Sequence, residues 1–304
     1  MTLGDLPEDE LRERLVRPLR STREPVLGIG DDCAAVRAGR DELLLLKTDA
    51  LVENIHFLRS QPAAKIGWKA LCRPLSDIAA MGGTPRDALV TFASPRDVEV
   101  RWWEAFYRGL SKAAVQFGVD IVGGESSASE STIFVSVALT GVVARNRMVT
   151  RSGGRPGDVL FVTGRLGGSL AGHHLSFVPR LAEAAWLVRE ARVRAMMDLS
   201  DGLGADLPRL AESSGVGYRV DLESLPLRRG VTTGQALGDG EDYELLMALS
   251  PGDAESLPPK WNQVFPKVPL TRIGVLTDPG RGKVLPTGGY DHFSGCQRPE
   301  NPSL

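Results

Sequence analysis

The chain has 304 residues, 42% of them apolar and 24% charged, and a formal net charge of −2 at pH 7. This length favours two domains over one hydrophobic core, and the small net charge argues against nucleic acid as a partner. Three scattered cysteines fit neither a disulfide framework nor a metal-binding spacing, and no apolar run approaches the roughly 20 residues that cross a bilayer. With an acidic start unlike a signal peptide, the chain is expected to be cytoplasmic and without a membrane partner.

Apolar periodicity predicts the elements of the first half of the chain. Apolar residues that recur every three or four positions predict helices at 7–19, 66–81 and 100–117. Short apolar or alternating runs predict strands at 43–48, 88–93 and 132–143. Tyr107 falls on the apolar stripe of the third helix, which favours core packing for its ring.

A basic stretch followed by glycine and proline at 145–158 indicates a domain boundary, and we expect domains at 1–147 and 148–304. In the second part, strands are predicted at 159–163, 196–199, 218–222 and 243–249. A glycine-rich turn at 164–168 is expected to open a helix, and a further helix is predicted at 205–212. Strands that alternate with helices favour an α/β or α+β fold for this domain.

Acidic residues recur beside glycine, serine or threonine, several of them directly after apolar runs. This set comprises Asp31, Asp32, Asp49, Asp77, Glu125, Asp198 and Asp201. If these acids converge, a hard cation such as Mg²⁺, bridged to the phosphates of a nucleoside triphosphate, would relieve their repulsion. The alternative is that each acid is a helix cap or a turn residue, and spacing alone does not decide between the two.

Phosphate-binding signatures are absent apart from the glycine-rich turn. Residues 164–169 could present backbone N–H groups to a phosphate or could be a plain turn between a strand and a helix. The chain has no G-x-x-x-x-G-K-[ST] and no G-x-G-x-x-G pattern. A nucleotide enzyme built this way would hold the phosphates mainly through metal ions.

Three other residues have both a functional and a structural interpretation. His56 could be a base or an anion-binding group, or a packing residue beside Phe57. Glu241 could bind a ligand or belong to an acidic turn, and Tyr290 could stack on a ligand or dock the end of the chain. The residues themselves leave these alternatives open.

Eight motifs, in order over nearly the whole chain, resemble those of thiamine-monophosphate kinases. They are GIGDDCAAV at 28–36, Thr48–Asp49 with His56–Phe57, GWKAL at 67–71, SDIAAMGG at 76–83, VGGE at 122–125, RSG to PGD at 151–158, MDLSDGL at 197–203 and GEDYELL at 240–246. The resemblance implies the two-domain fold shared with aminoimidazole ribonucleotide synthetase, with an N-terminal domain that pairs in a homodimer and an α+β C-terminal domain. It also implies direct, in-line transfer of the ATP γ-phosphoryl group to thiamine monophosphate, with Mg²⁺, to give thiamine diphosphate.

The resemblance assigns a role to each motif position. The metal-binding positions would be Asp32, Lys47, Thr48, Asp49, Asp77, Glu125, Asp198 and Asp201, with Asp32, Asp49, Asp77 and Asp201 central to catalysis. The ATP-binding positions would be Tyr107, Gly124, Glu125, Arg151 and Ser200, and those for thiamine monophosphate would be His56, Glu241 and Tyr290.

The chain departs from the family pattern at five positions. Lys47 stands where Thr or Ser is usual, and could replace a metal ligand with a fixed cation. The others are Pro74, expected to kink its helix, and Glu125, Gly168 and Asp239. Two rival functions therefore stay open: an enzyme resembling aminoimidazole ribonucleotide synthetase, and a nucleotide-binding module with impaired catalysis.

Overall fold

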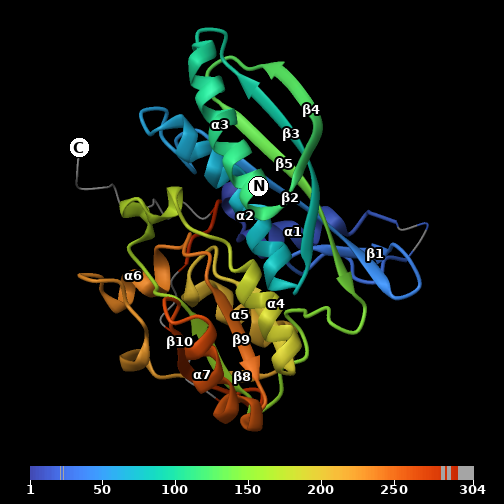
Figure 1. Cartoon of the computed structure of the whole chain (residues 1–304), viewed down its shortest axis with the longest axis vertical. Helices are drawn as coiled ribbons and strands as arrows, with labels where there is room; N and C mark the ends of the chain where they lie inside the picture. The colour runs from blue at the N-terminus through green and yellow to red at the C-terminus, as the bar shows by residue number, and fades with distance from the viewer. Residues whose placement is uncertain (21, 23, 282–284, 286–288, 294–304) are drawn as a thin grey trace.

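Two five-stranded sheets, one from each half of the chain, organise the protein (Figure 1). The computed structural model describes residues 1–20, 22, 24–281, 285 and 289–293. The strand order is β1-β2-β5-β3-β4 in the first sheet and β7-β9-β6-β10-β8 in the second. Each sheet belongs to a domain of its own. The predicted boundary between residues 147 and 148 stays a prediction, and it lies in the connection between β5 and β6.

The first sheet is mixed and is built around β5. Its strands are β1 (Ala34–Arg37), β2 (Glu42–Val52), β3 (Thr84–Ser94), β4 (Asp120–Ala128) and β5 (Phe134–Ala144). The β3–β4 pair is parallel, and the other pairs are antiparallel. Alternate residues of β5, including Val135, Val137 and Leu139, are buried under the helices, as the predicted two-residue period requires.

Two long helices, α2 (Ala63–Ala80) and α3 (Val100–Phe117), cover this sheet (Figure 1). They cross closely because both crossing positions are glycine: a Cβ at Gly67 would lie 1.9 Å from the Phe106 carbonyl oxygen. At Gly109 it would lie 1.7 Å from the Ala64 carbonyl oxygen. Helix α2 continues through Pro74 and also contacts β7 and α4 of the second domain. It therefore carries side chains to the level where the domains meet.

The second sheet is antiparallel, which resolves the predicted alternatives in favour of α+β. Its strands are β6 (Val159–Thr163), β7 (Val193–Asp198), β8 (Gly217–Val220), β9 (Leu245–Leu249) and β10 (Leu270–Thr277). Its helices are α4 (Leu181–Glu190), α5 (Leu203–Ser213), α6 (Thr233–Gly238) and α7 (Pro251–Val264). Every residue of β6 and β9 is buried, since both are internal strands with side chains packed on either face.

Several predicted elements differ from the structure. Asp49 and Glu125 lie inside β2 and β4 instead of after a strand, and the helix expected after the glycine-rich turn is replaced by two short 3₁₀ turns. The first helix, α1, spans only Glu8–Val16.

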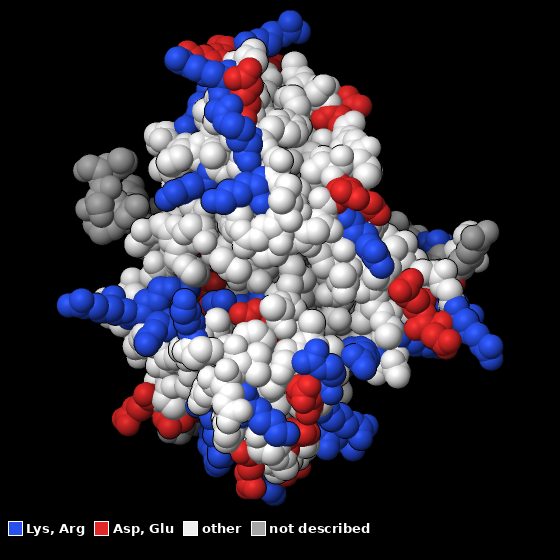
Figure 2. All heavy atoms as spheres, viewed as in Figure 1, with Lys and Arg blue, Asp and Glu red and all other residues white. Residues whose placement is uncertain are grey.

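Among the described residues, no helix is long and apolar enough to span a membrane. On the face of the protein seen in Figure 2, the surface carries side chains of both charges. Basic side chains lie over α3, where Arg101, Arg108 and Lys112 are exposed.

Candidate active site

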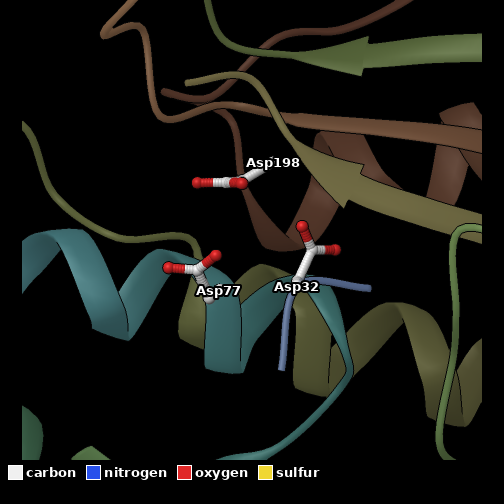
Figure 3. Close-up of side chains that lie close together, drawn as sticks. All are labelled: Asp32, Asp77 and Asp198. Atoms are coloured by element: carbon white, nitrogen blue, oxygen red, sulfur yellow. The ribbon is translucent and has the colours of Figure 1, made fainter. Parts of the chain in front are cut away.

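Three buried aspartates from distant parts of the chain converge where the domains meet (Figure 3). Asp32 follows the turn at Gly30, whose φ is 125°, Asp77 lies in the last turn of α2, and Asp198 ends β7. One carboxylate oxygen of each lies within 4.8 Å of the others. The predicted convergence of acids is therefore present for these three residues.

Burial and repulsion from neighbouring carboxylates disfavour the ionised forms of Asp77 and Asp198. Burial, followed by the charge of Asp32, raises the pKa of Asp198 to about 7. Burial also raises the pKa of Asp77 well above its ordinary value, and Asp198 and Asp49 add to this rise although Lys47 opposes it. Asp32 Oδ2 is buried and has no hydrogen-bond partner among the described residues. Closely spaced hard oxygen atoms, one of them unsatisfied, fit a divalent cation such as Mg²⁺.

Two cations flank the three aspartates. Lys47 Nζ lies 2.6 Å from Asp77 Oδ1, and Arg151 donates to Asp32 Oδ1 from Nη2 at 2.5 Å and from Nε at 3.1 Å. Burial lowers the pKa of Lys47, but Asp77 and Asp49 together raise it further, so the side chain stays protonated. An ammonium group has no lone pair to give a metal ion, and the ion pair favours the fixed-cation alternative for Lys47.

The neighbouring positions of β2 divide between the two faces of the sheet. Lys47 and Asp49 point towards α2, where Asp49 Oδ1 lies 3.5 Å from Arg73 Nη2. Thr48 points to the opposite face, and its Oγ1 lies 3.2 Å from Ser136 Oγ. The Thr48 side chain is therefore not brought to the three aspartates.

Asp201 belongs to a separate charged group on α5 and the turn before it. Its Oδ2 accepts from Arg209 Nη1 at 2.5 Å, and the same nitrogen lies 3.2 Å from Asp206 Oδ1. Asp206 Oδ2 in turn accepts from the Asp201 backbone N–H at 3.0 Å. The adjacent Ser200 is half-buried, and its carbonyl accepts from the Glu241 N–H at 2.7 Å.

A second group of predicted residues lies close to the three aspartates. Glu241 Oε2 accepts from the fully buried Lys69 Nζ at 2.5 Å, and the same ammonium donates to the His56 carbonyl at 2.7 Å. The His292 ring lies 5.2 Å from the His56 ring and 4.7 Å from the Tyr290 ring. The structure therefore brings His56, Glu241 and Tyr290 into one neighbourhood.

His56 is neutral in this setting. Burial, followed by the charge of Arg73, lowers the pKa of His56 to about 2. Its Nδ1 accepts a hydrogen bond from the Val52 N–H at 3.0 Å, which fixes the tautomer. Because the ring is uncharged, it is not a cationic anion-binding group.

Tyr107, Gly124 and Glu125 do not join these groups within one chain. Tyr107 is 37% exposed, so the core packing expected from its helix stripe is wrong. Glu125 pairs with Thr91 in β3, Thr91 with Ser136 in β5, and Ser136 with Ala50 in β2. Three strand spacings therefore separate Glu125 from the row next to Asp49, a distance of about 14 Å.

The glycine-rich turn uses its backbone donors internally. Gly167 N–H donates to Asp242 Oδ2 at 3.0 Å and Gly168 N–H donates to Asp239 Oδ2 at 2.8 Å. With these two donors occupied and no α-helix beginning there, the plain-turn alternative is favoured over the phosphate cradle.

The motifs assigned no role to Lys69 and Arg73, two charged residues of α2. Lys69 and Arg73 precede Asp77 at intervals of four residues, so the three share one helix face. That face meets Glu241, Asp49 and Lys47. A charged stripe on an otherwise apolar helix was the signal that could have identified Lys69 and Arg73. Nothing comparable marks Arg209.

Comparisons with known proteins agree with this architecture. Residues 30–143 match the AIR synthase related protein, N-terminal domain, and residues 155–285 match the AIR synthase related protein, C-terminal domain. Thiamine-monophosphate kinase of Rhodopirellula baltica is 36% identical over 292 residues, covering 90% of each chain. That of Aquifex aeolicus is 36% identical over 325 residues, covering 96% of this chain and all of the relative.

A solved structure of AaThiL complexed with AMPPCP and TMP is similar throughout. It superposes with a TM-score of 0.84 at 34% identity, covering 96% of this chain and 99% of the other. Identity at this level over nearly the full length of both chains, together with the two matching domains, decides the family. The chain belongs to the thiamine-monophosphate kinase family.

Proposed function

We propose that the protein transfers the γ-phosphoryl group of ATP to thiamine monophosphate and so forms thiamine diphosphate. The observation that carries the proposal is the group of three buried aspartates between the domains, beside the His56, Glu241 and Tyr290 neighbourhood. The relatives named thiamine-monophosphate kinase and the AaThiL complex with AMPPCP and TMP support the same reaction.

The residues fit Mg²⁺, with Asp32, Asp77 and Asp198 as its principal ligands. The unsatisfied Asp32 Oδ2 and the raised pKa values of Asp77 and Asp198 support this, because a divalent cation would restore their ionised forms. When bound, Mg²⁺ would screen the charge that develops on the phosphates during transfer. Asp49 and Asp201 are proposed as further ligands, each already beside a cationic side chain.

The chain itself supplies positioning and fixed positive charge. Arg151 donates to Asp32, beside the three aspartates, where its guanidinium can also contact the nucleotide phosphates. Lys47 holds Asp77 in one orientation. Because the acceptor is a phosphate that is already ionised, the reaction needs no strong base, and alignment with charge screening is sufficient.

Glu241 and Tyr290 are proposed to bind the thiamine part of the acceptor. A carboxylate and an aromatic face suit a flat cation, and the neutral His56 ring lies next to them. The ion pair with Lys69 would hold the Glu241 carboxylate in place. In the family pattern, Ser200 and Tyr107 would contact ATP.

A homodimer is proposed to complete the site. Every residue of β4 is exposed, and one side of this strand carries no partner in the described part of the chain. An exposed strand edge of nine residues favours pairing with a second copy. Such pairing would explain why Glu125, about 14 Å from Asp49 within one chain, could act at the site formed mainly by the other subunit.

Mixed dimers test this arrangement. Asp49→Asn and Glu125→Gln subunits, each inactive alone, are unfolded together, refolded and assayed. If Asp49 and Glu125 of different subunits share a site, random pairing restores about a quarter of the wild-type activity. No recovery, with mixed dimers present, would mean that each chain contains its own site.

Thiamine-monophosphate-dependent release of ADP, with Asp49→Asn as the inactive control, tests the reaction itself. ATP binding without that release would instead identify the impaired nucleotide-binding module. A ribonucleotide substrate that replaces thiamine monophosphate would identify an enzyme like aminoimidazole ribonucleotide synthetase.

A further inference from the structure

Two buried polar atoms beside the candidate site have no hydrogen-bond partner within the described residues. They are Arg73 Nε and Tyr243 Oη. Buried polar groups are normally satisfied in a folded protein, so this group points to a missing polar ligand.

Tyr243 is held rigidly beside Arg73. Lys69, one turn before Arg73 in α2, pairs with Glu241, two residues before Tyr243, so the two segments are in contact. In keeping with this, Tyr243 is the largest influence on the pKa of Arg73 after burial. The tyrosine ring stacks on Phe177 with ring centres 4.0 Å apart and planes 16° apart. The backbone of Tyr243 has a φ of 51° and that of Glu241 a φ of 55°, a region that non-glycine residues rarely adopt. Strained backbone of this kind is typical of functional sites.

The Arg73 guanidinium retains unused donors. Nη1 donates to the Ala50 carbonyl at 2.8 Å, and Nη2 makes only a long contact of 3.5 Å with Asp49. A guanidinium has five N–H groups in a planar fork, the geometry that matches phosphate oxygens. Arg73 contacts Asp49 and lies one helical turn from Lys69, the partner of Glu241, so it is near both the metal-binding and the thiamine-binding groups.

We propose that Arg73 and Tyr243 bind the phosphate monoester of the acceptor. This inference rests on the proposed function and extends it. Thiamine monophosphate has a cationic end and an anionic end, and the site offers matching groups in the same order. Glu241 faces the cation, and the Arg73 fork and the Tyr243 hydroxyl donate to the phosphate, which then lies next to Asp49 and the nucleotide.

A pair of ligands that differ only by the phosphate tests the role of Arg73. Thiamine and thiamine monophosphate are titrated by calorimetry against the full chain with Mg²⁺ and AMPPCP. We expect Arg73→Met to weaken the binding of thiamine monophosphate roughly 10- to 100-fold, with little effect on the binding of thiamine. The reason is that only the phosphate loses a charge-assisted hydrogen bond. Arg73→Lys should recover part of the loss, and Arg189→Ala, an exposed arginine on α4, is the matched control.

Tyr243→Phe separates binding from a structural role. The hydroxyl has no partner in the free protein, so its removal should leave the melting temperature unchanged or higher. The KM for thiamine monophosphate should nevertheless rise several-fold while the KM for ATP stays constant. Tyr218→Phe, on β8 of the second sheet, serves as the control.

Three results would overturn the inference. They are an equal loss of affinity for thiamine and thiamine monophosphate in Arg73→Met, equal changes of both KM values in Tyr243→Phe, and a wild-type protein that does not prefer thiamine monophosphate to thiamine. The proposed function fails separately. A wild-type protein that makes no thiamine diphosphate, but whose preference for the phosphorylated ligand depends on Arg73, would refute the reaction and support this site.

Discussion

Replacing Asp198 by asparagine should stabilise the metal-free protein and remove its response to metal. The side chain keeps its size, but the carboxylate that burial and Asp32 disfavour is gone. In the wild type, the pKa of Asp198 rises from the ordinary 3.8 to about 7 on folding. The folded state therefore binds a proton more tightly than the unfolded state, and the protein loses stability as the pH rises through this window.

The size of the effect follows from that shift. A pKa difference of about three units lowers the free energy of unfolding of the wild type by about 4 kcal/mol at pH 8, where the folded carboxylate is ionised. At pH 5 the same difference lowers it by about 2 kcal/mol. The value at pH 8 is an upper figure, since burial also raises the pKa of the neighbouring Asp77. At roughly 2–4 °C per kcal/mol, Asp198→Asn should melt several degrees above the wild type at pH 8 in EDTA.

Thermal denaturation with and without metal provides the assay. At pH 8, Mg²⁺ at about 100 times its dissociation constant should stabilise the wild type by about 2.7 kcal/mol, and Asp198→Asn much less. The difference in melting temperature between the metal-free wild type and metal-free Asp198→Asn should decrease on acidification to pH 5. The electrostatic reasoning is refuted if the variant is less stable than the wild type at pH 8 in EDTA, or if Mg²⁺ stabilises both equally.

Three further predictions concern the stability of the fold, and each is measured by urea denaturation. Gly109→Ala should cost at least 1–3 kcal/mol, because the new Cβ would overlap the Ala64 carbonyl oxygen, whereas Gly252→Ala, with open space around it, should cost nothing; equal effects would contradict the close crossing. Lys69→Met should cost about 3–5 kcal/mol by leaving a buried glutamate without its cation, and a change below 1 kcal/mol would argue against that pair. Thr232→Ala should cost about 1 kcal/mol through loss of the capping box of α6, and unchanged stability would exclude that cap.

Helices and strands with a strong period were predictable from the sequence. The positions of α2 and α3 follow from apolar residues at helical intervals, and β5 follows from its two-residue alternation. The length of β2 could not be predicted, because Lys47 and Asp49 interrupt the apolar pattern. The strand continues through them since their side chains meet charged groups of α2.

Two further segments were not predicted correctly, one rich in glycine and one that contains a pair of prolines. The turn after β6 does not open an α-helix, because Gly167, Gly168 and Gly172 all have positive φ values and leave only 3₁₀ turns. Helix α7 was not among the predicted elements, and it continues through Pro258 and Pro259, a pair that is unfavourable inside a helix. Tertiary packing, and not local preference, stabilises this helix.

The residue types of the site were predictable, but their grouping was not. The acids beside glycine and serine identified Asp32, Asp77 and Asp198, whereas their convergence depends on how α2 and β7 pack between the domains. The motifs also gave no indication that Glu125 lies on an exposed strand edge far from Asp49 in the same chain. Distances across a sheet follow from strand order, which periodicity does not determine.

The most direct test of the proposed reaction follows the phosphorus atom. The protein is incubated with γ-³²P-labelled ATP, thiamine monophosphate and Mg²⁺, and the products are separated with EDTA and Asp49→Asn controls. We expect label in the terminal phosphate of thiamine diphosphate, in an amount equal to the ADP formed, and none in either control. ADP formed with the label released as inorganic phosphate, or labelled thiamine diphosphate formed equally by Asp49→Asn, would contradict it.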